Sequence, residues 1–468
     1  MTELLEPTSP SAETELRRSF RGPVVGPTDP DFDRVRAVWN GMHDRRPSTI
    51  LRCTSPTDVG AALRYARATG QPVTVRGGGH NVAGTALADG AVLIDLSLMR
   101  EVTVDPERRI AHAQGGSLLA DVDAATTPHG LACPAGVVSH TGLGGLALGG
   151  GYGWLARKWG LTCDHILAAE VVLADGSVVV ADEDHHPDLL WGLRGGGGNL
   201  GIVTRFTLRL RPVGPVHLHT GVFPLDRGLE ALARYREFAE AQGPDLHAVG
   251  ALKHAGTQDW IPAELRGEPA LFLTAAWFGD PARGPEHTDP LFASAAASDV
   301  RLLEYAELQA LGDHGEPHGN RYYTKSCYLS ELTGDAAGQL LASAAAMVSP
   351  YSSVDFEYLR GAIADVPDEE SAFPRRDAPY IVTVSSQWTD PDRDAANADW
   401  SRLGVRRLAP WQHGGAYVNY LQDEAPGKVA EVYGAARYER LAELKRRFDP
   451  RNVLSGNQNI LPTSPAHR

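Results

Sequence analysis

The spacing of apolar and polar positions predicts alternating helices and strands in the first third of the chain. From Ser55 to Gly70, apolar residues recur three and four positions apart, with a serine that can cap the start and a glycine that can end the helix. The apolar run 73–75 predicts a strand directly afterwards, and 109–114 alternates as a half-buried strand does. This succession of elements is typical of an α+β fold.

The same patterns extend the prediction along the chain. Further helices are expected at 117–125, 225–242, 336–347 and 428–448, and further strands at 91–96, 165–173, 177–180, 202–210, 271–278, 352–359 and 380–388. The prolines and glycine of 212–215 mark a boundary, after which glycines become rarer and aromatic residues more frequent. We therefore expect a loose, proline-rich N-terminal arm (1–30), a first domain (31–213), a second α+β domain (214–415) and a C-terminal segment (416–468).

Composition narrows the function class. The chain has 468 residues, of which 43% are hydrophobic and 22% charged, as in soluble globular proteins of two or three structural units. The net charge of −14 disfavours nucleic-acid binding. No apolar run is long enough to span a membrane, and no signal peptide is visible. Four scattered cysteines without a CxxC pair predict a reducing, cytoplasmic location.

Glycine clusters carry the candidate chemistry. Gly77, Gly78 and Gly79 follow the predicted strand 73–75, and the backbone N–H groups of such a turn can cradle phosphate oxygens. A second cluster lies in 131–153, with its glycines densest at 142–151, and a third runs through 195–201. The third satisfies GxGxxG at 196–201, but a strand follows it instead of a helix, which argues against a Rossmann NAD site. Taken alone, the first cluster could also be a glycine-rich hairpin with a surface histidine, His80.

In this order, the three clusters resemble the FAD site of the vanillyl-alcohol-oxidase and p-cresol-methylhydroxylase (PCMH) type. Within that type the chain resembles the berberine-bridge-enzyme-like oxidases, in particular the bacterial 6-hydroxy-D-nicotine-oxidase-like subgroup. The resemblance implies a two-part PCMH-type FAD-binding domain (31–213), a substrate-capping domain (214–415) and a berberine-bridge-like segment (416–468) that packs on the FAD domain. The FAD-binding residues that it implies are Arg76, Gly77, Gly78, Gly79, His80, Asn81, Gly84, Gly136, Val138, Ser139, Thr141, Gly142, Gly145, Gly149, Tyr152, Gly198, Gly201, Ile202, Val203, Asn419, Asn457 and Asn459.

The resemblance also implies a covalent bond between His80 and the 8α carbon of the flavin; the alternative is a histidine beside non-covalent FAD. Some relatives add a second link from a cysteine to the flavin. Counting back from the glycine triplet at 149–151 puts that position near Val138, five residues after Cys133. We therefore expect Cys133 to be a small buried residue and the flavin to be attached once.

The candidate catalytic residues lie near the C-terminus and in the second domain. Tyr420 is favoured over Tyr417 as a proton acceptor beside the flavin, provided that a cation such as Lys325 depresses the pKa of the phenol. Ordinary core packing would explain either tyrosine equally. Glu357 is a second candidate base, if the strand 352–359 turns it toward the flavin and desolvation raises its pKa; a surface position is the alternative.

Thr141 is expected in the loop over the reactive edge of the flavin, where small side chains leave room for dioxygen. His185–His186 and His217–x–His219 lack the company of further metal ligands, so no metal is predicted.

Together these features predict an FAD-dependent oxidase that takes hydride from an alcohol or amine carbon of a small, secondary-metabolite-type molecule and gives electrons to dioxygen. A dehydrogenase of the same fold with another acceptor, and a flavin-holding protein without turnover, remain alternatives. Substrate identity and oligomeric state, a homo-oligomer included, stay open.

Overall fold

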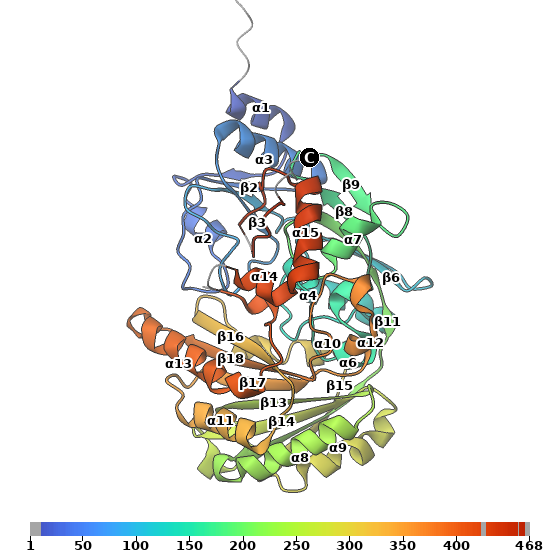
Figure 1. Ribbon diagram of the computed structural model, residues 1–468, viewed down its shortest axis with the longest axis vertical. Helices are drawn as coiled ribbons and strands as arrows, with labels where there is room; N and C mark the ends of the chain where they lie inside the picture. The colour runs from blue at the N-terminus through green and yellow to red at the C-terminus, as the bar shows by residue number, and fades with distance from the viewer. Residues whose placement is uncertain (1–10, 423–426, 457, 464–468) are drawn as a thin grey trace, which may run out of the picture.

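The computed structural model describes residues 11–422, 427–456 and 458–463 (Figure 1). The segment up to about residue 213 and the C-terminal helices form one part of the molecule, and a broad sheet backed by helices forms the other. The chain contains both helices and strands in large numbers, and its two larger sheets are antiparallel. This confirms the predicted α+β class.

A small, mainly parallel sheet holds the first predicted strand. Its order is β1 (Val24–Val25), β2 (Thr49–Arg52), β4 (Val92–Asp95), β3 (Val73–Arg76), with β2, β4 and β3 parallel. A parallel pair needs a crossover connection, and α3 (Pro56–Thr69) supplies it between β2 and β3. The Ser55 hydroxyl accepts a hydrogen bond from the backbone N–H of Asp58, and Gly70 ends the helix at φ 67°, as the sequence predicts.

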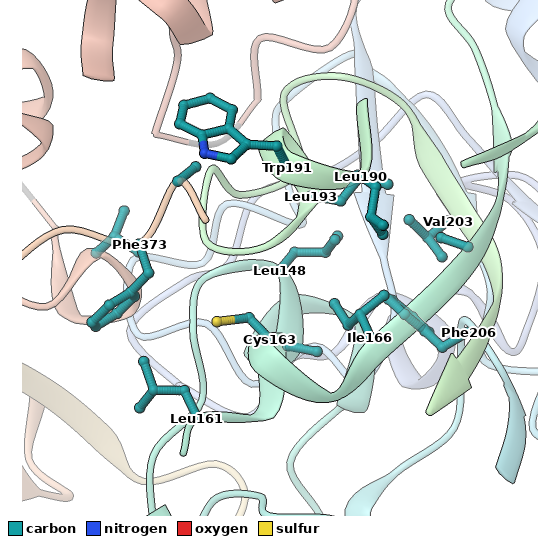
Figure 2. Packing of buried hydrophobic residues seen from close by; sticks show 14 of the residues in the cluster. Leu148, Leu161, Cys163, Ile166, Leu190, Trp191, Leu193, Val203, Phe206 and Phe373 are labelled. Carbon is teal, nitrogen blue, oxygen red and sulfur yellow. The ribbon is translucent and has the colours of Figure 1, made fainter. Parts of the chain in front are cut away.

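The second sheet is antiparallel and follows the order β5 (Val102–Asp105), β6 (Ile110–Gln114), β10 (Ile202–Arg209), β8 (Ile166–Val172), β9 (Val178–Ala181). Because β10 follows the third glycine cluster directly, the interpretation of 196–201 as the entrance to a strand is correct. Ile166, Val203 and Phe206 of this sheet pack with Leu190 of α7 (Pro187–Leu193) in the largest hydrophobic core (Figure 2). The glycine clusters therefore rest on a rigid base.

The third sheet and the helices on it form the second part of the molecule, which we call the capping part. Its strands, in spatial order, are β15 (Ala297–Leu303), β12 (Val216–Pro224), β14 (Pro269–Trp277), β13 (Leu246–His254), β17 (Ser353–Tyr358), β18 (Tyr380–Trp388) and β16 (Arg321–Leu329). Helices α8 (Gly228–Ala241), α9 (Gly284–Phe292), α11 (Gly334–Ala345) and α13 (Asp394–Arg407) pack against it (Figure 1).

Side-chain alternation divides the two faces of this sheet. On β17, Val354 and Phe356 enter the core beneath the helices, whereas Ser353, Asp355 and Glu357 line a cavity on the opposite side. Successive strand residues point to opposite faces, so this register turns a polar row toward the first part of the molecule.

Shorter elements connect these units. They are α2 (Phe32–Arg36), α4 (Leu119–Thr126), β7 (Leu131–Ala132), α5 (Leu143–Leu148), α6 (Ala156–Trp159), β11 (Arg211–Pro212), α10 (Tyr305–Gln309) and α12 (Ala362–Asp365). Part of the second glycine cluster thus forms the helix α5. Among the described residues, no helix is long and apolar enough to cross a membrane.

Two predictions at the ends of the chain are wrong. Within the expected loose arm, α1 (Ala12–Ser19) packs on α3, with Leu16 and Phe20 buried, because apolar residues at this spacing give the helix one face to bury. The expected helix 428–448 is two helices, α14 (Lys428–Tyr433) and α15 (Ala435–Phe448). Gly434 separates them, and its φ of 76° and ψ of 156° lie outside the helical region.

Candidate active site

A cavity of about 660 Å³ lies between the glycine clusters and the polar face of the capping sheet. It begins beside β3 and residues Leu454 and Gly456, passes the glycine clusters, and ends against β13, β17 and β18. Elements from both ends of the sequence and from the capping sheet therefore share one continuous site.

Two glycine clusters touch each other through their backbones. A Cβ placed on Gly78 would lie 2.5 Å from the backbone N and the Cα of Gly142, and one on Gly142 would lie 2.4 Å from the N of Gly78. Gly79 beside them has φ +70°, a conformation that favours glycine. Only residues without side chains allow this approach, which leaves a wall of exposed main chain that fits a flat, phosphate-bearing cofactor such as FAD.

Most of the predicted cofactor-binding residues line this cavity. They are Arg76, Gly77, Gly78, Gly79, His80, Asn81, Gly136, Val138, Thr141, Gly142, Gly145, Tyr152, Gly198, Gly201, Ile202, Val203 and Asn419. The Arg76 guanidinium forms two hydrogen bonds to Asp95, with Nε–Oδ1 3.1 Å and Nη2–Oδ2 2.7 Å, and donates to the carbonyl of Val35. This arginine therefore holds the strand edge in place.

Four predicted residues lie away from the cavity wall, and Asn457 falls outside the described residues. Gly84 packs against the His43 ring, which a Cβ would meet at 2.3 Å. Ser139 is turned to Asp313, to which its backbone N–H and hydroxyl donate at 2.7 and 2.6 Å. Gly149 packs against the Asn419 side chain, and the Oδ1 of Asn459 is buried without a hydrogen-bond partner.

His80 lies in a cluster of rings that the sequence did not reveal. Its Nε2 is 3.2 Å from Nδ1 of His140, and the indole of Trp39 stacks on its ring at 4.2 Å and 14°. Tyr322 stacks on the other face of Trp39 at 3.7 Å, and the His318 ring meets His80 edge-on at 6.4 Å. Burial, His140 and His318 lower the pKa of His80 to about 3, so its imidazole is neutral near pH 7.

Three tyrosines meet at the middle of the cavity. The hydroxyl of Tyr152 donates to that of Tyr420 at 3.4 Å, and the hydroxyl of Tyr417 accepts hydrogen bonds from the N–H of Gly151 and the amide of Asn419, each at 2.9 Å. Burial raises the pKa of both Tyr420 and Tyr417, and Glu357 and Asp355 raise that of Tyr420 further.

Lys325 is not among the groups that shift the pKa of Tyr420, which are Tyr152, Tyr417, Glu357 and Asp355 beside burial. Its ammonium lies 5.5 Å from the ring centre of Tyr323. The depression of the tyrosine pKa that we expected is therefore wrong for this structure.

Carboxyl groups face the cavity from the capping sheet. Glu357 Oε2 lies 3.1 Å from Nε2 of the buried His247, so the expectation that this strand turns Glu357 toward the site is correct and the surface alternative is not. Burial raises the pKa of Asp355 to about 6, while the Ser353 hydroxyl, which donates to it at 2.6 Å, opposes the shift. Burial and then Asp355 raise the pKa of Glu316, also in the wall, to about 8.

The sequence signal for Asp355 was present, because it stands two residues from Glu357 on the same strand face. Trp39, His140, His247 and His318 come from four separate segments. His140 stands between two predicted FAD-binding residues, Ser139 and Thr141, whereas nothing in the sequence around the other three marks them. Cys133 lies in the hydrophobic core with 1% exposure, and burial raises the pKa of its thiol. Among the described residues, no group of three or more metal-ligating side chains could hold a metal ion.

Comparison with known proteins agrees with this geometry. Residues 47–182 match the family model described as FAD binding domain, and residues 416–461 match the model described as berberine and berberine like. The chain is 41% identical over 456 residues to (R)-6-hydroxynicotine oxidase of Paenarthrobacter nicotinovorans, which covers 95% of this chain and 97% of the relative. It belongs to the berberine bridge enzyme-like family of FAD-linked oxidoreductases.

Further relatives of this family show its breadth. The aclacinomycin-N/aclacinomycin-A oxidase of Streptomyces galilaeus is 28% identical over 484 residues, covering 92% of this chain and 88% of the relative. The structure of Physcomitrella patens BBE-like 1 matches with a TM-score of 0.86 over 97% of this chain and all of the other, at 21% identity. The family assignment confirms an FAD-dependent oxidoreductase on the predicted fold.

Proposed function

We propose that this family member is a covalently flavinylated oxidase. It removes hydride from an alcohol or amine carbon of a small, secondary-metabolite-type molecule and passes the electrons to dioxygen, giving hydrogen peroxide. The observation that carries the proposal is the continuity of one cavity from the glycine wall and His80 to Glu357 on the capping sheet. Bound FAD supplies the hydride acceptor, and the residues of the chain attach it, orient the substrate and move the proton.

The state of His80 supports the covalent attachment. Bond formation to the flavin methyl carbon needs a free lone pair on the imidazole, and a protonated ring has none. The lowered pKa of His80 leaves the ring neutral over the whole physiological range. Its stacking on Trp39 holds the ring plane in one orientation. Cys133 is too deeply buried in the core to reach the cavity, which supports a single attachment.

Glu357 is the better candidate for the proton acceptor. A phenol with a raised pKa is a poor base near pH 7, and burial puts Tyr420 in that state. The Glu357 carboxylate lies in the same cavity, and His247 fixes it through the 3.1 Å contact. We therefore assign proton removal to Glu357, and to Tyr420 a hydrogen-bonding role at the reacting carbon.

The carboxyl groups in the cavity wall favour an amine over an alcohol as the substrate. Asp355, Glu357 and Glu316 face the cavity, and among the described lining residues Lys253 supplies the ammonium group. The raised pKa of Glu316 leaves this group mostly protonated near pH 7, so it adds little charge. Carboxylates in the wall attract a protonated amine, whereas an uncharged alcohol gains only hydrogen bonds from them. The four cysteines are buried and free, which supports the proposed cytoplasmic location.

The test uses a panel of small amines and alcohols with the purified protein. Under anaerobic conditions, an oxidised substrate bleaches the flavin absorbance, and admission of air restores it with one equivalent of hydrogen peroxide. Bleaching that air does not reverse would indicate a dehydrogenase with another acceptor. A flavin that no compound bleaches would indicate a flavin-holding protein without turnover.

A further inference from the structure

The contact between His80 and His140 joins the proposed attachment site to a side chain without an assigned role. Nε2 of His80 is 3.2 Å from Nδ1 of His140, and the two ring centres are 5.0 Å apart. One of these nitrogens must carry the shared hydrogen, because a neutral imidazole has one N–H donor and one acceptor. The direction of this hydrogen bond therefore decides which nitrogen of His80 keeps its lone pair.

We propose that His140 is the positioning residue for covalent attachment. It accepts the hydrogen bond from Nε2–H of His80 and thereby leaves the lone pair of His80 on Nδ1, the nitrogen that bonds to the flavin. This inference rests on the covalent attachment proposed above.

Hydrogen bonds on both sides of His140 fix its backbone. The carbonyls on either side of it, those of Ser139 and Thr141, accept hydrogen bonds from the N–H groups of Ala120 and Leu119 at 2.8 and 2.9 Å. The first turn of α4 thus fixes both neighbours of His140, and the Ser139–Asp313 bonds add a third anchor. A histidine on such a support keeps one orientation without being part of the cavity wall.

Contacts with Trp39 fix the orientation of the His80 ring. The backbone N–H of Trp39 donates to the carbonyl of Gly79 at 3.1 Å. Trp39 therefore holds His80 twice: its backbone bonds to the preceding residue, and its indole stacks on the His80 ring. The indole N–H of Trp39 in turn donates to the carbonyl of Glu316 at 3.0 Å. With its plane fixed by stacking and one nitrogen engaged by His140, the imidazole has a single nitrogen left for the ligand.

The bond-forming step balances with dioxygen as the final oxidant. A bond forms between Nδ1 of His80 and the methyl carbon at position 8 of the flavin, and one C–H bond of that methyl group breaks. The Nε2 proton of His80 leaves through the hydrogen bond to His140, so that the attached imidazole is neutral. The two electrons released remain on the ring system until dioxygen takes them with both protons, forming hydrogen peroxide.

Four full-length proteins test this role: wild type, His140→Leu, His140→Asn and His318→Leu. Each is produced in riboflavin-starved cells and then mixed with excess FAD, and samples are precipitated with acid over time. Flavin in the pellet measures the covalent fraction, and flavin in the supernatant measures the non-covalent fraction. His318→Leu is the comparison variant: it also removes a ring beside His80 and His140, whose centres lie 6.4 and 4.9 Å away, but it removes no hydrogen bond to His80.

We expect covalent attachment on the order of tenfold slower in His140→Leu, as for other partners that orient a functional histidine. His140→Asn should be intermediate, since its amide oxygen can accept the hydrogen bond but cannot take up the proton. His318→Leu should slow attachment much less than His140→Leu, because it leaves the hydrogen bond to His80 in place. Digestion of the wild-type protein should yield a flavinyl peptide substituted at Nδ1 of His80. This readout reports the tautomer and is insensitive to a merely structural role.

Three results would overturn the role of His140: a leucine variant as fast as wild type, an asparagine variant no faster than leucine, or attachment through Nε2. If His140→Leu does not fold, the asparagine variant and the attachment nitrogen still decide. Wild-type protein that releases all of its flavin into the supernatant would disprove the covalent link and this inference with it, while FAD binding itself would stand.

Discussion

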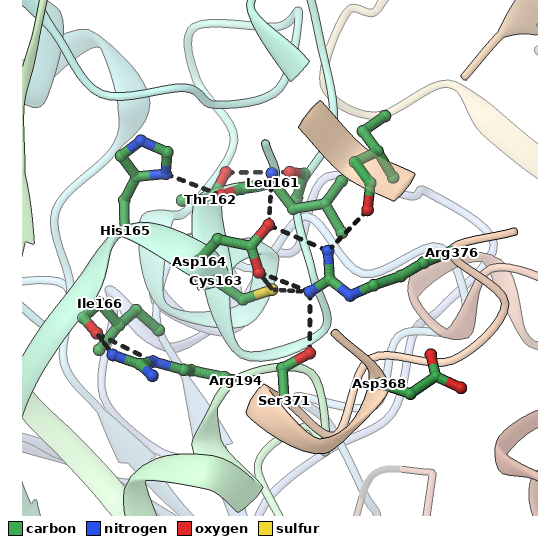
Figure 3. Close-up of polar contacts among 12 residues, drawn as sticks. Leu161, Thr162, Cys163, Asp164, His165, Ile166, Arg194, Asp368, Ser371 and Arg376 are labelled. Atoms are coloured by element: carbon green, nitrogen blue, oxygen red, sulfur yellow. Dashed lines mark hydrogen bonds and ion pairs between the residues drawn. The ribbon is translucent and has the colours of Figure 1, made fainter. Parts of the chain in front are cut away.

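Arg376 and Asp164 form a buried ion pair that joins the capping part to the FAD-binding part (Figure 3). The Nη2 of Arg376 lies 2.5 Å from Oδ1 of Asp164 and also donates a hydrogen bond to the Ser371 hydroxyl oxygen at 2.8 Å. The side chains are 2% and 9% exposed. Phe373, three residues before Arg376, packs against Gly150 of the second glycine cluster, where a Cβ would lie 2.5 Å from its ring. The pair therefore fixes the segment that backs the cofactor site.

Replacing Arg376 with leucine should lower the free energy of unfolding by about 3 kcal/mol, because the Asp164 charge is left buried without its partner. FAD should bind more weakly as well, since Phe373 loses its anchor. Urea unfolding and FAD titration measure the two effects. Arg446→Gln is the control: its partner Glu443 is about as exposed as it is, with 45% and 54% exposure, and such pairs contribute less than about 1 kcal/mol. Equal losses in both variants would contradict the structural role.

The close contact between Gly78 and Gly142 predicts that neither position tolerates a side chain. Gly78→Ala would place a methyl group 2.5 Å from the Gly142 backbone, which must move apart. We expect a loss of at least about 1 kcal/mol of stability, typical of overpacking, and weaker FAD binding. Gly338→Ala in α11 meets nothing within 4 Å and should be neutral or stabilising, since alanine is the better helix residue. Normal FAD affinity in Gly78→Ala would argue against a cofactor on this wall.

Glu357→Gln should reduce turnover by about 100-fold or more, as expected for the loss of a general base, while the flavin stays bound and its spectrum is unchanged. Tyr420→Phe should reduce turnover less, about tenfold, because the raised pKa of this phenol makes it a poor base near pH 7. Rapid mixing of substrate with each variant under anaerobic conditions gives the rate of flavin reduction directly. A larger effect in the tyrosine variant would reverse the assignment.

The sequence predicted the positions of helices and strands better than the contacts between residues that are far apart in the chain. Ser55, Gly70 and the strand after the third glycine cluster were found because their signals are local: a cap, a stop and an alternation. Asp355 could have been found beside Glu357 by counting along the strand. The ring cluster around His80 could not, because Trp39, His140 and His318 meet only when loops of the FAD-binding part and the segment before β16 come together.

The lowered pKa expected for Tyr420 is wrong for a related reason. Its pKa depends on which charges surround it, and no local pattern shows that Lys325 lies beside Tyr323 while Glu357 and Asp355 act on Tyr420. The break of the C-terminal helix at Gly434 is different, because the glycine was visible in the sequence. A single glycine costs a helix only about 1 kcal/mol, so the sequence did not decide between a break and a continuous helix.

A buried acid outside the cavity gives a final prediction about pH. Asp123 of α4 is 4% exposed, and burial raises its pKa from 3.8 to about 7, although a hydrogen bond from the Gln309 side chain opposes the shift. Its Oδ2 and the Oε1 of Gln309 are both buried acceptors without a partner among the described residues. A proton on Asp123 would supply the missing donor.

Because the folded chain holds this proton to a higher pH than the unfolded chain does, the stability from Asp123 is complete below about pH 4 and is lost as the pH rises through about 7. Asp123→Asn keeps the shape and removes the titration. Its stability relative to wild type should therefore improve between pH 5 and pH 8, by at least about 1 kcal/mol. Urea unfolding at both pH values measures this difference, with the exposed Asp184→Asn as control. A constant difference between Asp123→Asn and wild type would mean that Asp123 is already ionised at pH 5.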